Sequence, residues 1–534
     1  QNRSRLVLAR DRTGIRPLFH VRSGGRLFFA SEVKALFAIA EIPRRLNMQA
    51  LGDIMTYWSV LGPQSIFDAV QSLEPGHLMV IEHDGSERIS RYWDWDFSEV
   101  DAHGVRSEQS YAEELNELLV DAVRLQLRAD VPVGAYLSGG LDSSAIAALV
   151  RQYNKAPLRT FSVAFEDGEF DESRYQQRMA AHLGTDHTSI HCRKADIAAV
   201  FPKVIWHTET PVLRTAPAPL MLLSGSVRDH GFKVVLTGEG ADEVFGGYDI
   251  FKEAKIRRFW ARQPHSRWRQ RLLDKLYPYL RHAPAGARAM NDRFYGAGLE
   301  RIAHPGFAHE PRWTTTRRSW QFLSGAAREA IGVRDPLTTI AAWLPDAVTR
   351  FPSMGRDQYV EAHTLLSGYL LNSQSDRVAM ANSIEGRFPF LDHRVIEFAN
   401  RLPPWLKIRG LTEKYLLKRT VGRLLPDDIA RRTKQPYRAP DSESFFVNSQ
   451  PVEYVNDLLS EARLREAGYF EPVAVAKLVN KCRAGKVIGF SDNMAFVGIL
   501  STMLVDELFV RGRRADDMSH ATPMNVSPLM AVES

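Results

Sequence analysis

Two adjacent glycines stand between an apolar run and a helix-like run in the segment 133–150. The apolar run 133–137 leads into Ser138-Gly139-Gly140-Leu141-Asp142-Ser143-Ser144, and the small apolar residues 145–150 follow. Glycines let a backbone approach a ligand closely, and the first amides of a helix attract anions. The order of strand, glycine turn and helix therefore predicts a parallel α/β unit with a phosphate site at the end of a strand.

The aspartate at position 142 indicates what kind of phosphate site this is. A carboxylate repels bare phosphate, so we expect Mg²⁺ between Asp142 and the phosphates of a nucleotide. The segment is not a P-loop, since no lysine follows the second glycine, and it lacks the glycine spacing of a dinucleotide fingerprint. The alternative is a Gly-Gly turn capped by a serine, with no ligand.

A second glycine-rich segment follows another strand-like run. After residues 233–236 the chain reads Thr237-Gly238-Glu239-Gly240-Ala241-Asp242-Glu243 and then, after two apolar residues, Gly246-Gly247-Tyr248. Acids bind metal ions or transfer protons, and glycines admit a ligand, so this segment suits a reaction centre opposite the first loop. The alternative is a flexible acidic surface loop.

Composition restricts the class of protein. The 534 residues are enough for two or three domains, and the net charge of +6 is too small to indicate nucleic acid binding. Cys192 and Cys482 form neither a disulfide framework nor a metal cluster, which favours a reducing cytoplasm. The apolar stretch 493–505 is too short to span a bilayer and predicts a buried helix. The basic stretch 255–271 is interpreted as a helix with solvated arginines and packed tryptophans.

The spacing of apolar residues divides the chain into parts. Ser110 and Glu113 form a capping box that opens an amphipathic helix, and beyond Ala241 the chain is mostly helical. Residues 96–109 predict a linker and residues 511–534 a disordered tail. Short alternating runs predict antiparallel strands at 6–9, 17–21, 26–30 and 77–82. Strands that alternate with helices, as in a parallel sheet, are expected at 134–137, 160–165, 188–191 and 233–236.

Several motifs together are similar to one family. The segments 138–144 and 238–248 resemble those of the glutamine-hydrolysing asparagine synthetases, which are class II amidotransferases. Further agreement comes from Thr160-Phe161-Ser162-Val163, Asp376-Arg377-Val378-Ala379-Met380-Ala381, Arg387-Phe388-Pro389-Phe390-Leu391-Asp392-His393, Glu413-Lys414-Tyr415-Leu416-Leu417 and Arg432-Thr433-Lys434. The resemblance covers residues 5 to about 440. It implies an α/β fold with an N-type ATP pyrophosphatase domain at 110–510, built on a parallel sheet with a largely helical C-terminal part.

The resemblance also implies roles for individual residues. Adenine and ribose would lie against Leu137, Val163, Thr237 and Gly238. Pyrophosphate would be held by Ser138, Gly139, Gly140, Asp142, Ser143 and Ser144. Asp142 and Asp242 would bind Mg²⁺, Lys434 would hold the leaving pyrophosphate, and Glu239 would assist formation and ammonolysis of the acyl-adenylate. A solvent-facing side chain is the alternative for Lys434. Thr237 and Ala241 stand where the family commonly has serine.

The front of the chain resembles the rear of an N-terminal-nucleophile glutaminase domain with αββα architecture. The matching stretches are 9–19 and 29–36. We therefore expect residues 1–95 to be the C-terminal portion of that domain, with its catalytic cysteine upstream of Gln1. Neither Cys192 nor Cys482 can replace that cysteine, because both lie outside this part of the chain.

By this resemblance the chain is an ATP-dependent amidotransferase. ATP would adenylate aspartate to β-aspartyl-AMP, and ammonia, derived from glutamine in the complete protein, would displace AMP to give asparagine. The first alternative is a β-lactam or lasso-peptide cyclase, or an amidotransferase of secondary-metabolite or polysaccharide biosynthesis. The second is a nucleotide-binding regulator without turnover. We expect a cytoplasmic enzyme that uses ATP and Mg²⁺ and has no nucleic acid or membrane partner, with a homodimer as one possible assembly.

Overall fold

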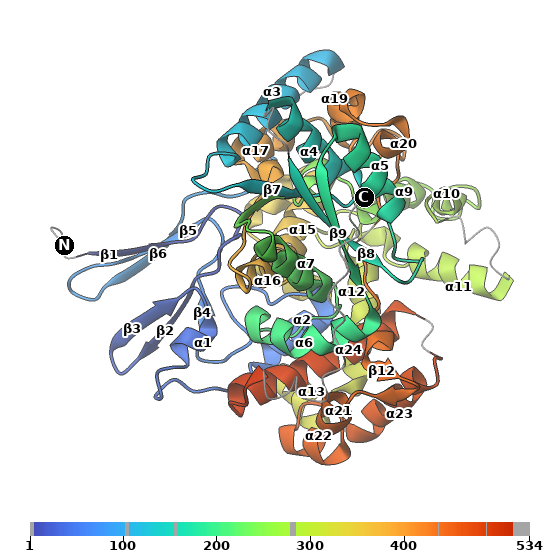
Figure 1. Ribbon diagram of the computed structural model, residues 1–534. Coiled ribbons are helices and arrows are strands. Elements are labelled where there is room, and N and C mark those ends of the chain that lie inside the picture. The colour runs from blue at the N-terminus through green and yellow to red at the C-terminus, as the bar shows by residue number, and fades with distance from the viewer. Residues whose placement is uncertain are drawn as a thin grey trace.

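The computed structural model describes residues 5–101, 106–153, 158–277, 285–435, 437–486 and 489–515, apart from the side chains of 285–289. It is a mixed α/β structure in which helices surround one parallel sheet (Figure 1). The α/β fold with a parallel sheet, predicted from the sequence, is confirmed. The predicted tail lies mostly outside the described residues, which end at Ala515.

The N-terminal part contains two small antiparallel sheets. The first has the strand order β1 (Leu6–Ala9), β5 (His77–Ile81) and β6 (Glu87–Arg91). The second has the order β3 (Arg26–Ala30), β2 (Phe19–Ser23) and β4 (Gln71–Ser72). Strand β2 starts two residues later than predicted, because Pro17 has no N–H for strand pairing. Helices α1 (Val33–Leu36) and α2 (Met48–Tyr57) lie between β3 and β4.

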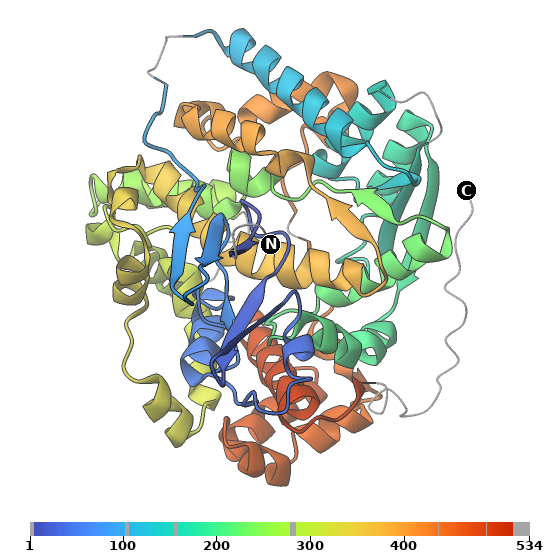
Figure 2. The same ribbon diagram turned by 90° about the vertical axis from the view of Figure 1, so that its left-hand side faces the viewer.

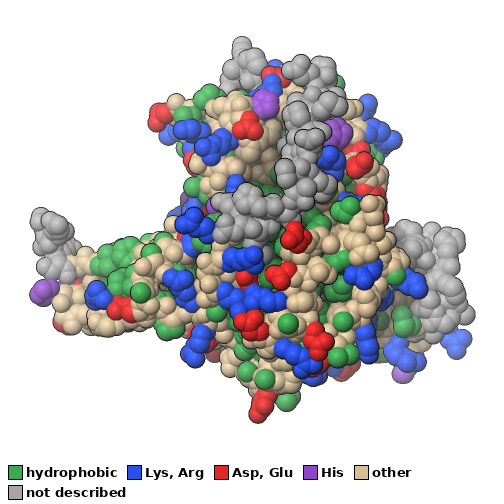
Figure 3. Space-filling model, turned by 60° about the horizontal axis from the view of Figure 1, so that its bottom comes forward, with side chains coloured by type: hydrophobic (Ala, Val, Ile, Leu, Met, Phe, Trp, Pro, Cys, Tyr) green, Lys and Arg blue, Asp and Glu red, His purple; other side chains and the backbone are tan. Residues whose placement is uncertain are grey.

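Apolar side chains are exposed on these N-terminal sheets. Leu6, Val7, Phe29 and Ile89 are between 39% and 54% exposed. Figure 3 shows hydrophobic side chains gathered on the arm that the N-terminal strands form, whereas the rest of that face mixes basic with acidic side chains. Concentrated apolar side chains of this kind are typical of a surface that contacts another part of a protein.

The parallel sheet places both glycine-rich segments at one edge. Its strand order is β11 (Glu385–Arg387), β10 (Val234–Leu236), β7 (Val133–Tyr136), β8 (Arg159–Phe165) and β9 (Asp186–Cys192). Strand β7 has β8 on one side and β10 on the other, so the strand order reverses at β7. Ligands of such sheets bind outside the carboxyl ends of the strands at this point. The Ser138 loop follows β7 and the Glu239 segment follows β10.

Helices cover both faces of this sheet (Figure 1). On one face α4 (Leu141–Tyr153) contacts both α3 (Glu108–Gln126) and α5 (Ser173–Leu183). On the other face α6 (Lys194–Thr208) packs on α7 (Pro217–Asp229). Helix α3 begins earlier than predicted, because Ser107 is its N-cap and accepts a hydrogen bond from the backbone N of Ser110 at 3.1 Å. The predicted capping box at Ser110 and Glu113 is therefore wrong, although the apolar face of the helix is buried as expected.

The rest of the chain is mostly helical, as predicted. After β10, residues 241–361 contain α8 (Ala241–Phe245), α9 (Asp249–Ala261), α10 (Leu273–Leu276), α11 (Ala285–Gly296), α12 (Glu310–Thr316), α13 (Gly325–Ile331), α14 (Pro336–Trp343) and α15 (Ser353–Glu361). The π-helix η6 (Ala362–Asp376) leads into α16 (Arg377–Met380), and α17 (His393–Arg401), α18 (Pro404–Lys407), α19 (Tyr415–Val421) and α20 (Asp427–Ala430) follow. The C-terminal part comprises β12 (Phe446–Val447), β13 (Gln450–Pro451), α21 (Glu453–Leu458), α22 (Glu461–Ala467), α23 (Pro472–Arg483) and α24 (Phe490–Val505).

The basic stretch 255–271 differs in part from its predicted character. Arg257 is fully buried, and its guanidinium donates hydrogen bonds to the carbonyls of Tyr295, Ala297 and Phe307 at 2.8–3.0 Å. The expectation of solvated arginines is therefore wrong at this position, because three backbone carbonyls replace water around the charge. Among the tryptophans, Trp260 is buried, whereas Trp268 is 57% exposed.

Helix α24 joins the C-terminal and N-terminal parts in one hydrophobic core. Its apolar residues pack with those of α2 and α6, and Figure 2 shows the red C-terminal helices beside the blue N-terminal part. The helix continues as a π-turn to Val510, so it is longer than the predicted 493–505. By length and composition residues 490–510 match a membrane span, but 89% of the apolar window is buried inside the protein. The prediction of a buried helix is confirmed.

Candidate active site

Glycines let both loops pack closely on their neighbours. Gly139 has a φ of +74°, and a Cβ there would lie 2.6 Å from the Cβ of Tyr175. A Cβ on Gly238 would lie 2.6 Å from the backbone N of Ser143. Larger residues would therefore push the β10 loop away from the start of α4. Gly139 therefore lets the first loop pack on α5, and Gly238 lets the β10 loop pack on the start of α4 at the predicted phosphate site.

The hydroxyl groups of the first loop hold it in one shape. Ser143 Oγ accepts a hydrogen bond from the backbone N of Ser138 at 3.1 Å and lies 2.9 Å from Ser138 Oγ. Ser138 and Ser143 line the cavity described below. Ser144 is fully buried in α4, and it is not among the residues that line this cavity; Gly139 and Gly140 are not among them either. The role of these three residues at a pyrophosphate stays a prediction.

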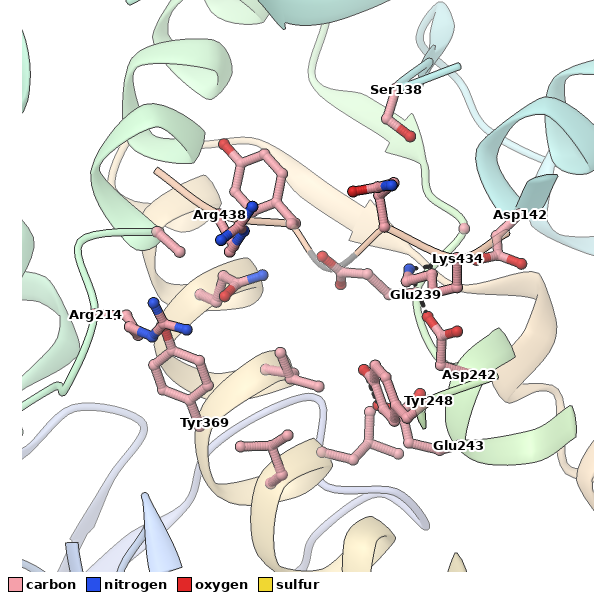
Figure 4. Close-up of a pocket in the computed structure, with 18 of the residues that line it drawn as sticks. Ser138, Asp142, Arg214, Glu239, Asp242, Glu243, Tyr248, Tyr369, Lys434 and Arg438 are labelled. Carbon is pink, nitrogen blue, oxygen red and sulfur yellow. Dashed lines mark hydrogen bonds and ion pairs between the residues drawn. The ribbon is translucent and has the colours of Figure 1, made fainter. Parts of the chain in front are cut away.

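Four charged side chains meet beside the Ser138 loop, and Figure 4 shows three of them, Asp142, Asp242 and Lys434. Lys414 Nζ lies 2.7 and 2.6 Å from the two carboxylate oxygens of Asp142 and 2.6 Å from Asp242 Oδ1. Lys434 Nζ lies 2.7 Å from Asp242 Oδ2 and 3.7 Å from Asp142 Oδ2. The structure therefore brings together Asp142, Asp242 and Lys434, which sequence reasoning had selected from three separate segments.

Asp242 and Lys434 each favour the charged form of the other. Burial favours the neutral form of Asp242, but Lys414 and Lys434 outweigh it and lower the pKa of that carboxyl. Burial alone would lower the pKa of Lys434, and Asp242 and Asp142 instead raise it above the ordinary value. The Lys434 side chain is 25% exposed and directs its ammonium group to Asp242 rather than to solvent. The two aspartates and two lysines therefore pair with one another beside the cavity, where charged groups of a ligand could replace these pairs.

Lys414 is a site residue that sequence reasoning missed. It precedes α19 with a φ of 50°, and its side chain is only 2% exposed. Its neighbour Glu413 accepts hydrogen bonds from Lys252 Nζ at 3.0 Å, Lys418 Nζ at 2.9 Å and the backbone N of Lys434 at 3.3 Å. Glu413 therefore ties the segment that carries Lys434 to the segment that carries Lys414. The only signal in the sequence was the position of Lys414 within a matching motif.

Glu239 differs from Asp142 and Asp242 because it forms no ion pair with any described residue. Its Oε2 is enclosed and has no hydrogen-bond partner among the described residues. Burial raises the pKa of Glu239 to about 7, although Ser375 and Lys434 oppose that rise. A carboxyl that titrates near neutral pH can accept or donate a proton during a reaction. The position of Glu239 between the two walls of the cavity is visible in Figure 4.

A cavity of about 590 Å³ connects these groups. The four residues assigned to adenine and ribose, Leu137, Val163, Thr237 and Gly238, all line it. Its other wall carries Arg214, Tyr369 and Arg438, for which the sequence suggested no role. Glu243 also lines the cavity: Tyr248 donates a hydrogen bond to it at 2.8 Å, and burial together with Asp242 raises the pKa of Glu243 to about 8.

A second cavity, of about 240 Å³, lies between the N-terminal part and the helices. It shares Trp58 and Tyr369 with the first cavity. The cysteines lie elsewhere: Cys192 and Cys482 are both buried outside residues 1–93, and burial raises the pKa of each thiol to about 12. Neither cysteine is therefore a reactive thiolate.

Comparison with known proteins gives a consistent result. The asparagine synthase family model matches residues 114–506, and the glutamine amidotransferase domain model matches residues 1–93. Asparagine synthetase [glutamine-hydrolyzing] 1 of Bacillus subtilis is 29% identical over 85% of this chain and 68% of that protein. Amidase chyE of Penicillium rubens is 28% identical over 96% of this chain and 78% of that protein. Amidase chry2 of Gibberella zeae is 28% identical over 88% of this chain and 72% of that protein.

The resemblance found in the motifs thus extends over both parts of the chain. One family model covers most of the residues, including the Ser138 loop, the Glu239 segment and Lys434. The match at residues 1–93 adds the glutaminase-type part. The chain belongs to the asparagine synthase family of ATP-using, amide-forming ligases.

Proposed function

We propose that this chain converts a carboxylic acid to an amide while ATP is cleaved to AMP and pyrophosphate, with aspartate as the acid and asparagine as the product. The observation that carries the proposal is the meeting of Asp142, Asp242, Lys414 and Lys434 at the carboxyl ends of β7 and β10. Beside them lies Glu239, whose Oε2 has no hydrogen-bond partner among the described residues. This arrangement offers opposite charges for a nucleotide and one group for proton transfer.

The reaction divides into two steps. In the first, a carboxylate oxygen of the acid attacks the α-phosphorus of ATP, and the bond to the β-phosphate oxygen breaks. Lys434 offers a positive charge to the pyrophosphate that leaves. In the second, ammonia attacks the acyl carbon and the bond to the AMP oxygen breaks. Glu239 accepts the proton that the nitrogen loses, which its pKa of about 7 allows.

Asp142 and Asp242 fit a Mg²⁺ ion that accompanies ATP. In nucleotide sites Mg²⁺ takes one or two carboxylates together with phosphate oxygens. Both carboxylates contact the same ammonium group, Lys414 Nζ, so they lie within reach of a single cation. No cluster of three or more metal-ligating side chains occurs among the described residues, so phosphates would supply further ligands. When bound, the ion would neutralise phosphate charge.

The two cavities support glutamine as the nitrogen source in the proposed function. Residues 1–93 match a glutamine amidotransferase domain, and the second cavity lies between this part and the helices that line the first. Trp58 and Tyr369 belong to the walls of both. In the proposed function ammonia released in the complete glutaminase part would enter here, and added ammonium would replace it.

Exchange of labelled pyrophosphate into ATP tests the first step. We expect exchange that depends on aspartate, needs Mg²⁺ and is lost in Asp142→Asn. Formation of asparagine and AMP from aspartate, ATP and ammonium chloride tests the second step. A chain that binds ATP but shows no exchange with any acid would instead be a regulator without turnover.

A second candidate function is the amidation of a different acid by the same chemistry. Two relatives that align with most of this chain are named amidases. The adenylation residues bind ATP and do not identify the acid. Exchange assayed across aspartate, glutamate and aromatic or aliphatic carboxylic acids separates the candidates, because the true substrate has the highest kcat/KM.

A further inference from the structure

The large cavity extends from the ATP loops to a part of the chain that the proposed reaction does not use. Glu243 and Tyr248 line it close to Asp242 (Figure 4). Further along the chain, Ile250 and Glu253 of α9 line it as well. The wall that α9, the residue after α10, α11 and α12 form is called the Glu253 lobe here, and it comprises Glu253, Tyr277, Phe294, Tyr295 and Thr315.

Glu253 offers one carboxylate oxygen that no described residue uses. The residue is 6% exposed, and its Oε2 accepts a hydrogen bond from the hydroxyl of Tyr277 at 3.0 Å. Its Oε1 is buried without a hydrogen-bond partner among the described residues. Buried polar groups are normally hydrogen-bonded, so this oxygen marks a place for a donor that a ligand brings.

The cations that act on Glu253 are bound to other groups. Arg257, one turn further along α9, donates to three backbone carbonyls, and its guanidinium lies 4.2 Å from the ring of Phe307. Arg312 donates to both carboxylate oxygens of Glu361. Burial raises the pKa of Glu253 to about 7, although Arg257, Tyr277 and Arg312 oppose that rise. Glu253 thus forms no ion pair with any described residue, and a cation from outside would stabilise its carboxylate.

Aromatic rings line the same lobe. The rings of Tyr277 and Tyr295 are stacked with their centres 5.7 Å apart, and Phe294 meets Tyr295 edge-on at 5.1 Å. All three side chains line the cavity and are half-buried. Tyr277 also contacts Glu253, so rings and carboxylate belong to one surface. Aromatic faces attract organic cations, and a carboxylate accepts hydrogen bonds from an ammonium group.

We propose that the Glu253 lobe binds the ammonium group of an organic amine, with Glu253 Oε1 as the hydrogen-bond acceptor and the rings of Tyr277 and Tyr295 beside the charge. Ile250 and Phe294 supply apolar surface for the hydrocarbon body of such a ligand. A hard metal ion takes about six oxygen ligands, and the described residues contain no cluster of three metal-ligating side chains. The inference goes beyond the proposed function, because this binding requires neither ATP nor adenylation.

Binding of benzylammonium to the full chain without ATP tests the lobe. In calorimetry we expect benzylammonium to bind at least tenfold more tightly than benzyl alcohol, which has the same ring and no charge. A hydrogen bond to a charged group is worth at least that factor. Equal binding of the two ligands, or no binding of either, would refute the ammonium site.

Glu253→Gln tests the role of the carboxylate. Glutamine keeps the size of the side chain and an oxygen that accepts from Tyr277, so the fold is retained. We expect at least tenfold weaker binding of benzylammonium and unchanged binding of benzyl alcohol. Asp292→Asn is the matched control, because it removes a carboxylate from α11 that does not line the cavity, and its affinity is expected to equal that of the wild-type chain.

Tyr295→Leu tests the aromatic wall independently of the carboxylate. Loss of one ring is expected to weaken binding of benzylammonium about fivefold, which is the contribution of a cation over an aromatic face. This variant also decides the matter if Glu253→Gln does not fold. Folded variants that bind benzylammonium as tightly as the wild-type chain would overturn the proposal.

The pH dependence of binding identifies the acid that accepts the ammonium group. The ionised fraction of a carboxyl with a pKa of about 7 rises about tenfold between pH 6 and pH 8, so the affinity should rise by that factor. Glu239 and Glu243 line the same cavity and have pKa values raised to about 7 and 8. They are unchanged in Glu253→Gln, so the same pH dependence in this variant would refute the assignment to Glu253.

Kinetics separate two sources of the ammonium group. If it belongs to the acid that is adenylated, benzylammonium raises the KM of that acid in pyrophosphate exchange, and Glu253→Gln raises it as well. If it belongs to a separate amine, benzylammonium binds and the KM of the acid is unchanged. Both results support the lobe as an ammonium site. If benzylammonium binds as expected but no acid supports exchange, the lobe stands and the proposed function fails.

Discussion

Replacing Glu239 by glutamine removes one ionisable group and keeps the shape of the side chain. In the folded chain burial raises the pKa of Glu239 to about 7, against an ordinary value of 4.5. Between these pH values the folded state keeps a proton that the unfolded state has lost, so the free energy of unfolding falls as the pH rises. The difference between the two pKa values corresponds to about 3 kcal/mol.

We therefore expect Glu239→Gln to increase the free energy of unfolding by up to about 3 kcal/mol at pH 8 and by less than about 1 kcal/mol at pH 5. The same substitution should lower the rate of amide formation by about 100-fold, because a positioned acid or base contributes at least that much. The variant would thus be more stable and less active than the wild-type chain. Urea unfolding at both pH values and formation of amide from the acid and ammonium measure the two effects.

Glu361→Gln provides a control of opposite sign. Burial favours the neutral form of Glu361, but Arg312 and His309 outweigh it and lower the pKa to about 2. Its carboxylate stabilises the folded chain at and above the ordinary pKa, and this contribution is lost only as the pH falls through about 2. Glu361→Gln is therefore expected to destabilise the chain at pH 5 and at pH 8 alike. A Glu239→Gln chain that is destabilised at pH 8, or that keeps full activity, would refute the reasoning.

Three further predictions follow from the site. Lys414→Met leaves two buried carboxylates with Lys434 alone, so we expect urea unfolding to show a loss of about 3 kcal/mol, whereas a loss below about 1 kcal/mol would mean that Lys434 suffices. Gly238→Ala brings a Cβ to 2.6 Å from the backbone N of Ser143 and should abolish ATP binding in calorimetry, while Gly325→Ala, with open space around its Cβ, should bind normally. The chain should form its amide from ammonium but release no glutamate from glutamine, because Cys192 and Cys482 are buried thiols with pKa values raised to about 12; glutamate release by this chain would contradict this prediction.

The ATP side of the site could be predicted because its signals are local in the chain. Strand β7, the Ser138 loop and the start of α4 are consecutive, and glycines and hydroxyls in that order have few alternative structures. The same holds for β10 and the Glu239 segment. Strand β11 was not predicted, because it has only three residues and its conformation depends on pairing with β10.

Other features depend on contacts that no local pattern shows. The burial of Arg257 requires the carbonyls of Tyr295, Ala297 and Phe307, which lie 38, 40 and 50 residues further along the chain. Lys414 faces Asp142 from a separate segment 272 residues away in the sequence. A basic residue in a loop is usually exposed, so its burial in an ion-pair cluster could be found only in three dimensions.

The wall of the cavity opposite the Ser138 loop combines segments that lie still further apart in the sequence. Arg214 precedes α7, Tyr369 belongs to η6, Arg438 follows Lys434, and Phe490 opens α24. Helix α24 packs in the core that also contains the N-terminal part, so the wall near Phe490 depends on packing far from the ATP loops. Substitutions on this wall can therefore change the acid that is bound while Asp142, Asp242 and Lys434 stay in place. A search for the substrate is therefore directed to the wall that carries Arg214, Tyr369 and Arg438.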